Sequence, residues 1–218
     1  MNAQGKRSGE TAREYAYRMI REQVISLELK PGEAFNDMEF AAKIGVSRTP
    51  VREAVIQLSE ESRIIEIFPQ RGMRIAPIDV ELVEEARSLR VLLEKQIAGM
   101  CCEMATEEYI KWLQENVGLQ EFYMENSRPE MVMQLDDEMH HKLFMICHRE
   151  LTYGMCQKLA IHYDRIRSLS VNTVKDNTII EDHRKIIQFI AEHKKENAMA
   201  QMEKHLSRWQ LNEGKFRQ

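Results

Sequence analysis

The stretch from Gly45 to Val55, which reads GVSRTPVREAV, limits what the N-terminal part of the chain can fold into. A glycine shortly before a serine suits a turn that ends one helix and caps the next. Pro50 then fits the first turn of the second helix, where its missing N–H costs nothing. Four apolar residues at helical spacing predict that this helix buries one face; they are Val51, Ala54, Val55 and Leu58.

Arg48, Thr49 and Arg52 fall off that apolar face. Arginine and hydroxyl side chains on the exposed side of a short helix are suited to phosphates and base edges, so the pattern predicts contact with nucleic acid. An ordinary surface helix with scattered arginines fits the spacing equally well. The neighbouring segments have to separate the two interpretations.

The flanking segments complete a winged helix-turn-helix. A helix is expected from Thr11 to just before the turn Lys30-Pro31-Gly32-Glu33, and a second from about Met38 to Ile44, capped by Asn36 or Asp37. A short turn then leads into the helix described above, which runs from about Arg48 to Glu60. Two apolar strands, 64–68 and 73–76, flank a hairpin turn at 69–72. The tip of this wing carries Arg71 and Gly72, a cation beside a residue that allows close backbone approach.

Glycine becomes scarce after residue 77, and long helical patterns begin. We therefore expect a flexible tail at 1–10, a DNA-binding domain at 11–77 and an all-helical domain at 78–218. Short connections between the helices predict an antiparallel bundle of six to seven helices, which makes the protein mainly α. The six expected helices are 79–100, 106–122, 127–147, 153–170, one from Thr173 or Asp176 to 193, and one from 197 into the C-terminus.

Composition is that of a soluble globular protein, with 43% hydrophobic and 30% charged residues. The sequence holds no apolar run of membrane-spanning length and no leader-like start, so we expect a cytoplasmic protein without membrane contact. The four cysteines show no CxxC spacing and lie in apolar surroundings, which favours reduced core residues. The net charge is −4, but residues 1–77 are near neutral, so a small basic surface there is still compatible with DNA binding.

Asp136 and His140 are four residues apart, so a helix places them on one face, one turn apart. His183 and His205 also fall on predicted helices. Three imidazoles and a carboxylate that project into a bundle core would bind a divalent transition metal. Surface histidines, or buried histidines with ordinary hydrogen-bond partners, are the alternative that the residues themselves leave open.

Three motifs in order make residues 11–76 resemble the winged-helix domain of the GntR family of bacterial transcription regulators. They are LKPGE at 29–33, GVSRTPVREA at 45–54 and PQRG at 69–72. The resemblance implies that Arg48 and Arg52 contact operator phosphates and a guanine edge, and that Thr49 contacts the backbone. It also implies that Arg71 and Gly72 enter the minor groove. Many members carry an arginine in the second helix, where this chain has Asp-Met-Glu-Phe at 37–40.

Residues 79–210 resemble the FCD ligand-binding domain of one GntR branch. Its metal-binding members use an Asp-x-x-x-His pair and two later histidines, a pattern that Asp136, His140, His183 and His205 match. The segment LRVLLE at 89–94 matches a second motif of the branch, and by that resemblance Arg90 binds an effector carboxylate near the metal. Arg165 or Arg167 is a weaker candidate for the same role.

Taken together, we expect a homodimeric regulator that binds a double-stranded DNA operator and responds to a small organic acid. The metal would be Zn, Ni, Mn or Fe. A metallo-hydrolase with open coordination positions is the alternative from another class, although the sequence offers no HExxH-like motif to supply a general base. A regulator with a purely structural metal is the third interpretation.

Overall fold

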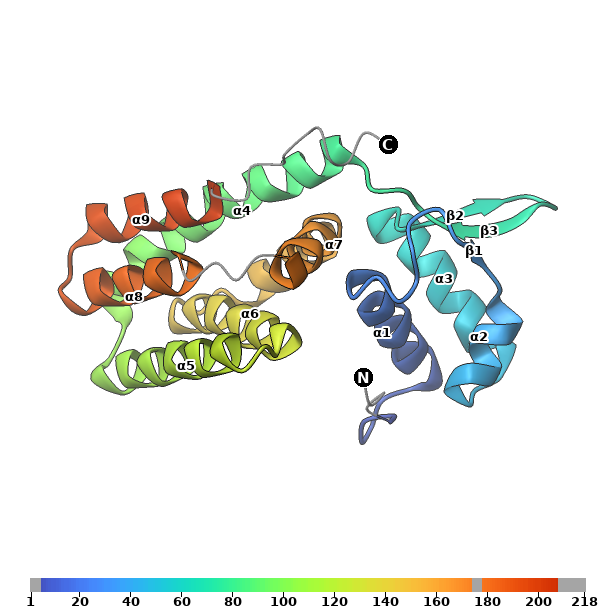
Figure 1. Ribbon diagram of the computed structural model, residues 1–218, viewed down its shortest axis with the longest axis horizontal. Helices are drawn as coiled ribbons and strands as arrows, with labels where there is room; N and C mark the ends of the chain where they lie inside the picture. Colours follow the sequence, from blue (N-terminus) through green and yellow to red (C-terminus); the bar gives the residue numbers. More distant parts are fainter. Residues whose placement is uncertain (1–4, 174–177, 208–218) are drawn as a thin grey trace. The chain divides into compact units, whose positions relative to one another are not determined.

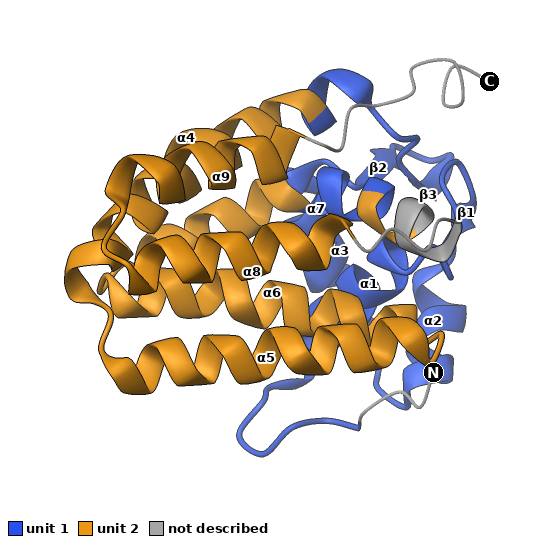
Figure 2. Cartoon of the chain, turned by 60° about the vertical axis from the view of Figure 1, so that its left-hand side comes forward, with its two compact units in different colours: residues 1–83, 161–166 blue, residues 84–160, 167–218 orange. Residues whose placement is uncertain are grey.

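The computed structural model describes residues 5–173 and 178–207, and within them the chain forms helices α1–α9 and strands β1–β3 (Figure 1). It divides into two compact units (Figure 2). Unit 1 runs as far as Val83 and includes Ile161–Ile166. Unit 2 contains Glu84–Ala160 and the residues from Arg167 onward. The mainly helical fold, with a small sheet confined to the N-terminal part, confirms the predicted fold class.

Unit 1 begins with the three predicted helices: α1 (Ala12–Ile25), α2 (Asp37–Ile44) and α3 (Arg48–Ser62). Thr11 caps α1 in a reciprocal capping box with Glu14. Gly45 ends α2 in the left-handed conformation at φ 73°, which a glycine adopts without strain. Ser47 occupies the N-cap position of α3, but its side chain makes no capping hydrogen bond, so the predicted cap is one of position only.

The sheet has three antiparallel strands in the order β1-β3-β2. β2 (Ile65–Phe68) and β3 (Gly72–Ile75) form the predicted wing hairpin, in which Phe68 pairs with Gly72. β1 (Ala34–Phe35) pairs with the other edge of β3 and was not predicted as a strand. Two residues are too few to show an alternating pattern, so only pairing with β3 reveals β1.

The core of unit 1 lies between α1, α3 and the sheet. All four apolar residues that predicted the buried face of α3 are completely buried. They pack in one cluster with residues of α1 and with Phe35, Phe40, Ile65 and Ile75. This packing fixes which side of α3 remains outside.

Unit 2 contains the remaining helices, except for the first residues of α4 and the segment Ile161–Ile166 of α7, which belong to unit 1. The bounds of these helices agree with the predicted ranges to within about one helical turn. They are α4 (Val80–Met104), α5 (Glu107–Glu125), α6 (Pro129–Ile146), α7 (Glu150–Thr173), α8 (Thr178–Ala191) and α9 (Lys195–Ser207). Thr106 caps α5 as predicted, and Pro129 occupies the first position of α6. The alternative helix start at Asp176 and the predicted extension into 208–218 lie outside the described residues.

Helix α5 packs against α6 and α8, and α8 packs against α9. Their apolar faces enclose one core cluster that includes Leu113, Met139, Phe144, Ile186 and Met202. All four cysteines are buried and unbridged, as predicted. Among the described residues, no helix is both long and apolar enough to span a membrane.

Candidate functional site

Helix α3 presents the predicted polar residues on the side opposite its buried face. Arg48, Thr49 and Arg52 line one shallow surface depression together with Glu53 and Ile56. The side chains of Arg48 and Arg52 are 56% and 62% exposed. A helix that is anchored by a fully buried apolar face and exposes two guanidinium groups has the form required for insertion into the major groove.

The wing places its predicted residues at the hairpin tip. Gly72 has φ 100°, a conformation that strains any residue with a Cβ, and Gln70 beside the tip also has a positive φ of 61°. Arg71 is exposed between them. On the strands, Arg74 forms an ion pair with Glu66, which leaves Arg71 as the cation at the tip itself.

In unit 2, the four predicted ligand residues lie together although they come from three helices. One donor atom from each of Asp136, His140, His183 and His205 can be chosen so that all four atoms lie within 4.8 Å of one another. The Nε2 atoms of His183 and His205 are 3.2 Å apart, and Asp136 Oδ1 lies 3.3 Å from His183 Nε2. His140 Nε2 lies 3.9 Å from Asp136 Oδ2. Helices α6, α8 and α9 therefore point three Nε2 atoms and one carboxylate at a common centre.

The cluster is buried, and burial together with neighbouring charges favours the protonation states of His183, His205 and Asp136 that bind metals. Burial lowers the pKa of His183 to about 3 and lowers the pKa of His205 well below its ordinary value. Burial alone would raise the pKa of Asp136, but Arg167 and the histidines outweigh it and hold that pKa low. Neutral imidazoles and an ionised carboxylate are the ligand forms. His140 Nε2 has no hydrogen-bond partner among the described residues.

Three of the four residues also have a bonding partner on their outer side. His140 Nδ1 contacts Glu94 on α4, and His183 Nδ1 lies 2.9 Å from Oε1 of Gln120 on α5. Arg167 on α7 donates to Asp136. His205 is the exception, because its Nδ1 lies 4.0 Å from Asp182 Oδ2 and has no hydrogen-bond partner among the described residues. Such partners fix which imidazole nitrogen faces a metal, as expected for a preorganised centre.

Sequence reasoning missed these outer partners, with one partial exception. Glu94 belongs to the LRVLLE segment that supported the family resemblance, so a signal for it was present. Gln120 and Asp182 carry no local signal, because their role depends on which helices pack together. The sequence predicts Arg167 only as a candidate effector residue and not as a partner of Asp136.

The two arginines predicted to bind an effector have different surroundings. Arg90 is buried, and its Nε donates to Glu94 Oε1 at 2.6 Å, while the other oxygen of Glu94 contacts His140 of the cluster. Burial alone would raise the pKa of Glu94, yet Arg90 and His140 lower it to about 2, so Glu94 is ionised. Arg165 lies in unit 1, where its guanidinium donates to the carbonyl oxygen of Ala76 at 2.8 Å. Of the two α7 arginines, Arg167 is therefore the one beside the cluster.

Comparison with known families matches both parts of the chain. Residues 12–75 match the bacterial regulatory proteins of the gntR family, and residues 85–208 match the FCD domain.

Characterised and uncharacterised relatives give the same result. The HTH-type transcriptional repressor RspR of Escherichia coli K12 is 30% identical over 158 residues, which cover 72% of this chain and 69% of that protein. An uncharacterized HTH-type transcriptional regulator of Streptomyces ambofaciens is 28% identical over 91% of this chain and 84% of its own length. Among solved structures, E. coli McbR/YncC superposes with a TM-score of 0.75 at 18% identity, covering 90% of this chain and 94% of that one. The likeness to McbR/YncC shows the fold alone.

Proposed function

This chain belongs to the GntR family and carries an FCD domain, and from that premise we propose how its affinity for an operator is controlled. A protein of this kind is a DNA-binding transcriptional regulator and not an enzyme, so the metallo-hydrolase alternative is wrong. In our proposal, a small carboxylate effector binds at a metal centre in the FCD domain and alters operator affinity. We keep the boundary near residue 77 as the proposed division between the domain that binds DNA and the domain that binds the effector.

The observation that carries the metal centre is the convergence of three buried Nε2 atoms and one carboxylate. Such a site would be costly without a cation, because buried polar atoms need partners and His140 Nε2 has none among the described residues. Asp136, His140, His183 and His205 would be the ligands. A nitrogen-rich set with one carboxylate suits Zn, Ni, Mn or Fe. The metal would supply a Lewis-acid centre for a carboxylate oxygen of the effector.

Two buried arginines support a carboxylate as the effector class. Arg167 bonds directly to the proposed ligand Asp136, whereas Arg90 bonds to Glu94, which in turn contacts the proposed ligand His140. Guanidinium groups recognise carboxylates in bidentate geometry. We infer that Arg90 binds the effector and that Arg167 contributes from α7. Arg165 remains the weaker candidate, since it donates to a backbone carbonyl in unit 1.

The effector would act on operator affinity through the arrangement of two winged helices in a homodimer. GntR regulators bind DNA operators and typically dimerise. A twofold operator requires two copies of the recognition helix at a fixed spacing, and a ligand shifts affinity only if it binds the two arrangements differently. A cytoplasmic location belongs to the same proposal.

The test combines metal binding with DNA binding. Metal content and affinity are measured by mass spectrometry and calorimetry for the wild type, for His183→Ala, and for His148→Ala, an exposed control histidine. We expect one tightly bound metal per chain in the wild type and the control, and none in His183→Ala. DNA affinity is then measured with and without a panel of small mono- and dicarboxylates, using sequences selected by the wild type from a random duplex library.

Three outcomes distinguish the alternatives. A wild type that binds no transition metal contradicts the metal centre. Metal binding without any effect of carboxylates on DNA affinity favours a purely structural metal. Effector binding that survives Arg90→Ala with the metal retained removes Arg90 from the proposal.

A further inference from the structure

A single buried carboxylate contacts both arginines of the recognition helix α3. Asp37 is the first residue of α2 and is 2% exposed. The Nε of Arg48 donates to Asp37 Oδ1 at 3.0 Å, and Arg52 NH1 lies 3.9 Å from Asp37 Oδ2. The sequence predicted at most a capping role for Asp37, and the structure gives the cap to Asn36 instead.

The position of the Asp37 carboxylate is fixed by the backbone around it. The Asn36 side chain accepts hydrogen bonds from the amides of Met38 and Glu39, at 3.0 Å and 3.3 Å, which determines the first turn of α2. Phe40, three residues further on, is anchored in the core of unit 1. Asp37 is therefore a rigid point, whereas the two arginines that it contacts are long and more than half exposed.

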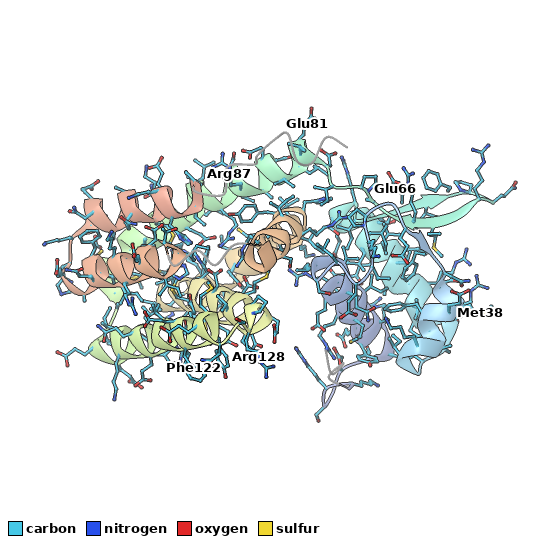
Figure 3. All side chains as sticks on the ribbon, viewed as in Figure 1. Met38, Glu66, Glu81, Arg87, Phe122 and Arg128 are labelled. Atoms are coloured by element: carbon cyan, nitrogen blue, oxygen red, sulfur yellow. The ribbon has the colours of Figure 1, made fainter. Side chains whose placement is uncertain are left out.

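We propose that Asp37 is a positioning residue for DNA readout, which orients Arg48 and Arg52 before DNA arrives. Ordering a long side chain at an interface costs conformational entropy, and tethering the guanidinium in the free protein lowers that cost on binding. Because Arg48 uses Nε for Asp37, its two terminal nitrogens remain suited to a guanine edge or a phosphate. Met38 beside Asp37 is exposed and uncharged (Figure 3), so this part of α2 adds orientation rather than positive charge.

Because Asp37 is negatively charged, its removal should affect sequence-specific and non-specific DNA binding in different ways. Non-specific binding follows the positive charge that faces the phosphates, and a carboxylate close to that surface opposes it. Removing the carboxylate should leave non-specific binding unchanged or stronger. Specific binding should weaken, because it depends on the orientation of the two arginines.

The test compares Asp37→Asn with Glu39→Gln. Both variants remove one negative charge from the first turn of α2, but Glu39 is exposed and bonds to Asn36 rather than to either arginine. Dissociation constants are measured by fluorescence anisotropy for the duplex selected by the wild type and for a scrambled duplex. We expect the ratio of the two constants to fall about tenfold in Asp37→Asn, from the lost preordering of two arginine side chains. In Glu39→Gln the ratio should stay at the wild-type value.

Equal ratios in the two variants would overturn the proposal. So would a folded Asp37→Asn that loses specific and non-specific affinity together, since that indicates a structural role. Asp37→Glu, which retains the charge, should recover part of the ratio.

A measurement on the wild type keeps the test decisive if Asp37→Asn does not fold. The Nε–H of Arg48 should exchange slowly with water in NMR spectra of the free protein, because it is hydrogen-bonded to Asp37. Exchange as fast as that of the exposed Arg63 would overturn the proposal.

Discussion

Replacing Gln120 by leucine tests whether the outer partners of the histidine cluster organise a metal centre. Gln120 is completely buried on α5. Its Oε1 lies 2.9 Å from His183 Nδ1, and its Nε2 donates to Asn116 Oδ1 at 2.8 Å. The amide orientation makes Oε1 an acceptor, so His183 carries its proton on Nδ1 and directs an unprotonated Nε2 at the cluster. Leucine has a similar volume but removes both hydrogen bonds.

The expected loss follows from the number of bonds removed. Losing one outer partner of a ligating histidine typically lowers metal affinity about 10- to 100-fold. Without metal, the buried nitrogen of His183 and the buried oxygen of Asn116 both lose a partner. Each such group costs about 1–3 kcal/mol, partly offset by the added apolar surface, so we expect the metal-free protein to lose about 2 kcal/mol.

The assay measures both quantities in the same samples. Metal affinity is obtained by calorimetry or by competition with a chelating dye, and stability from thermal unfolding with and without metal. Gln114→Leu is the matched control, because Gln114 is an exposed residue on the same helix. A metal affinity in Gln120→Leu that stays within about twofold of the control would refute the role assigned to Gln120, since outer partners act at the tenfold level or above.

Three further predictions concern the recognition helix, the core and pH. Arg52→Ala should abolish detectable binding to the selected DNA in anisotropy titrations, whereas Arg63→Ala should bind like the wild type; tight binding by Arg52→Ala would contradict the placement of α3 in the groove. Leu58→Ala should lower the free energy of unfolding by about 2–5 kcal/mol in denaturant titrations, because Leu58 is fully buried. A loss below about 1 kcal/mol, the level expected for a substitution of the half-exposed Ile56, would contradict the core role of Leu58. Burial lowers the pKa of His183 from 6.5 to about 3. Between these two pH values, His183 therefore takes up a proton in the unfolded chain but not in the folded chain. The stability contributed by neutral His183 is therefore complete above pH 6.5 and is lost as the pH falls towards 3. The melting temperature of the metal-free protein should fall on acidification over this range, and it should fall less steeply in His183→Gln.

The sequence alone determined the features that are encoded within one helix or one turn. The buried face of α3 follows from the spacing of Val51, Ala54, Val55 and Leu58, and the left-handed turn at Gly45 follows from the conformational freedom of glycine. Asp136 and His140 share a face because they are four residues apart, which is close to the 3.6 residues of one helical turn. For the same reason, the helix order and the wing hairpin were predictable from local pattern.

Tertiary structure decided which of these local features meet. His140 and Glu94 are 46 residues apart in the chain, and His183 and Gln120 are 63 apart, so no local spacing joins them. Strand β1 exists only because it pairs with β3, and Asp37 became a partner of Arg48 only because α2 packs against α3. Local pattern fixes which face of an element is apolar or polar, whereas the partner of a buried polar group depends on how several elements pack against one another. The candidate ligands could therefore be named from the sequence, but the residues that orient them and the residue that orients the arginines of α3 could not.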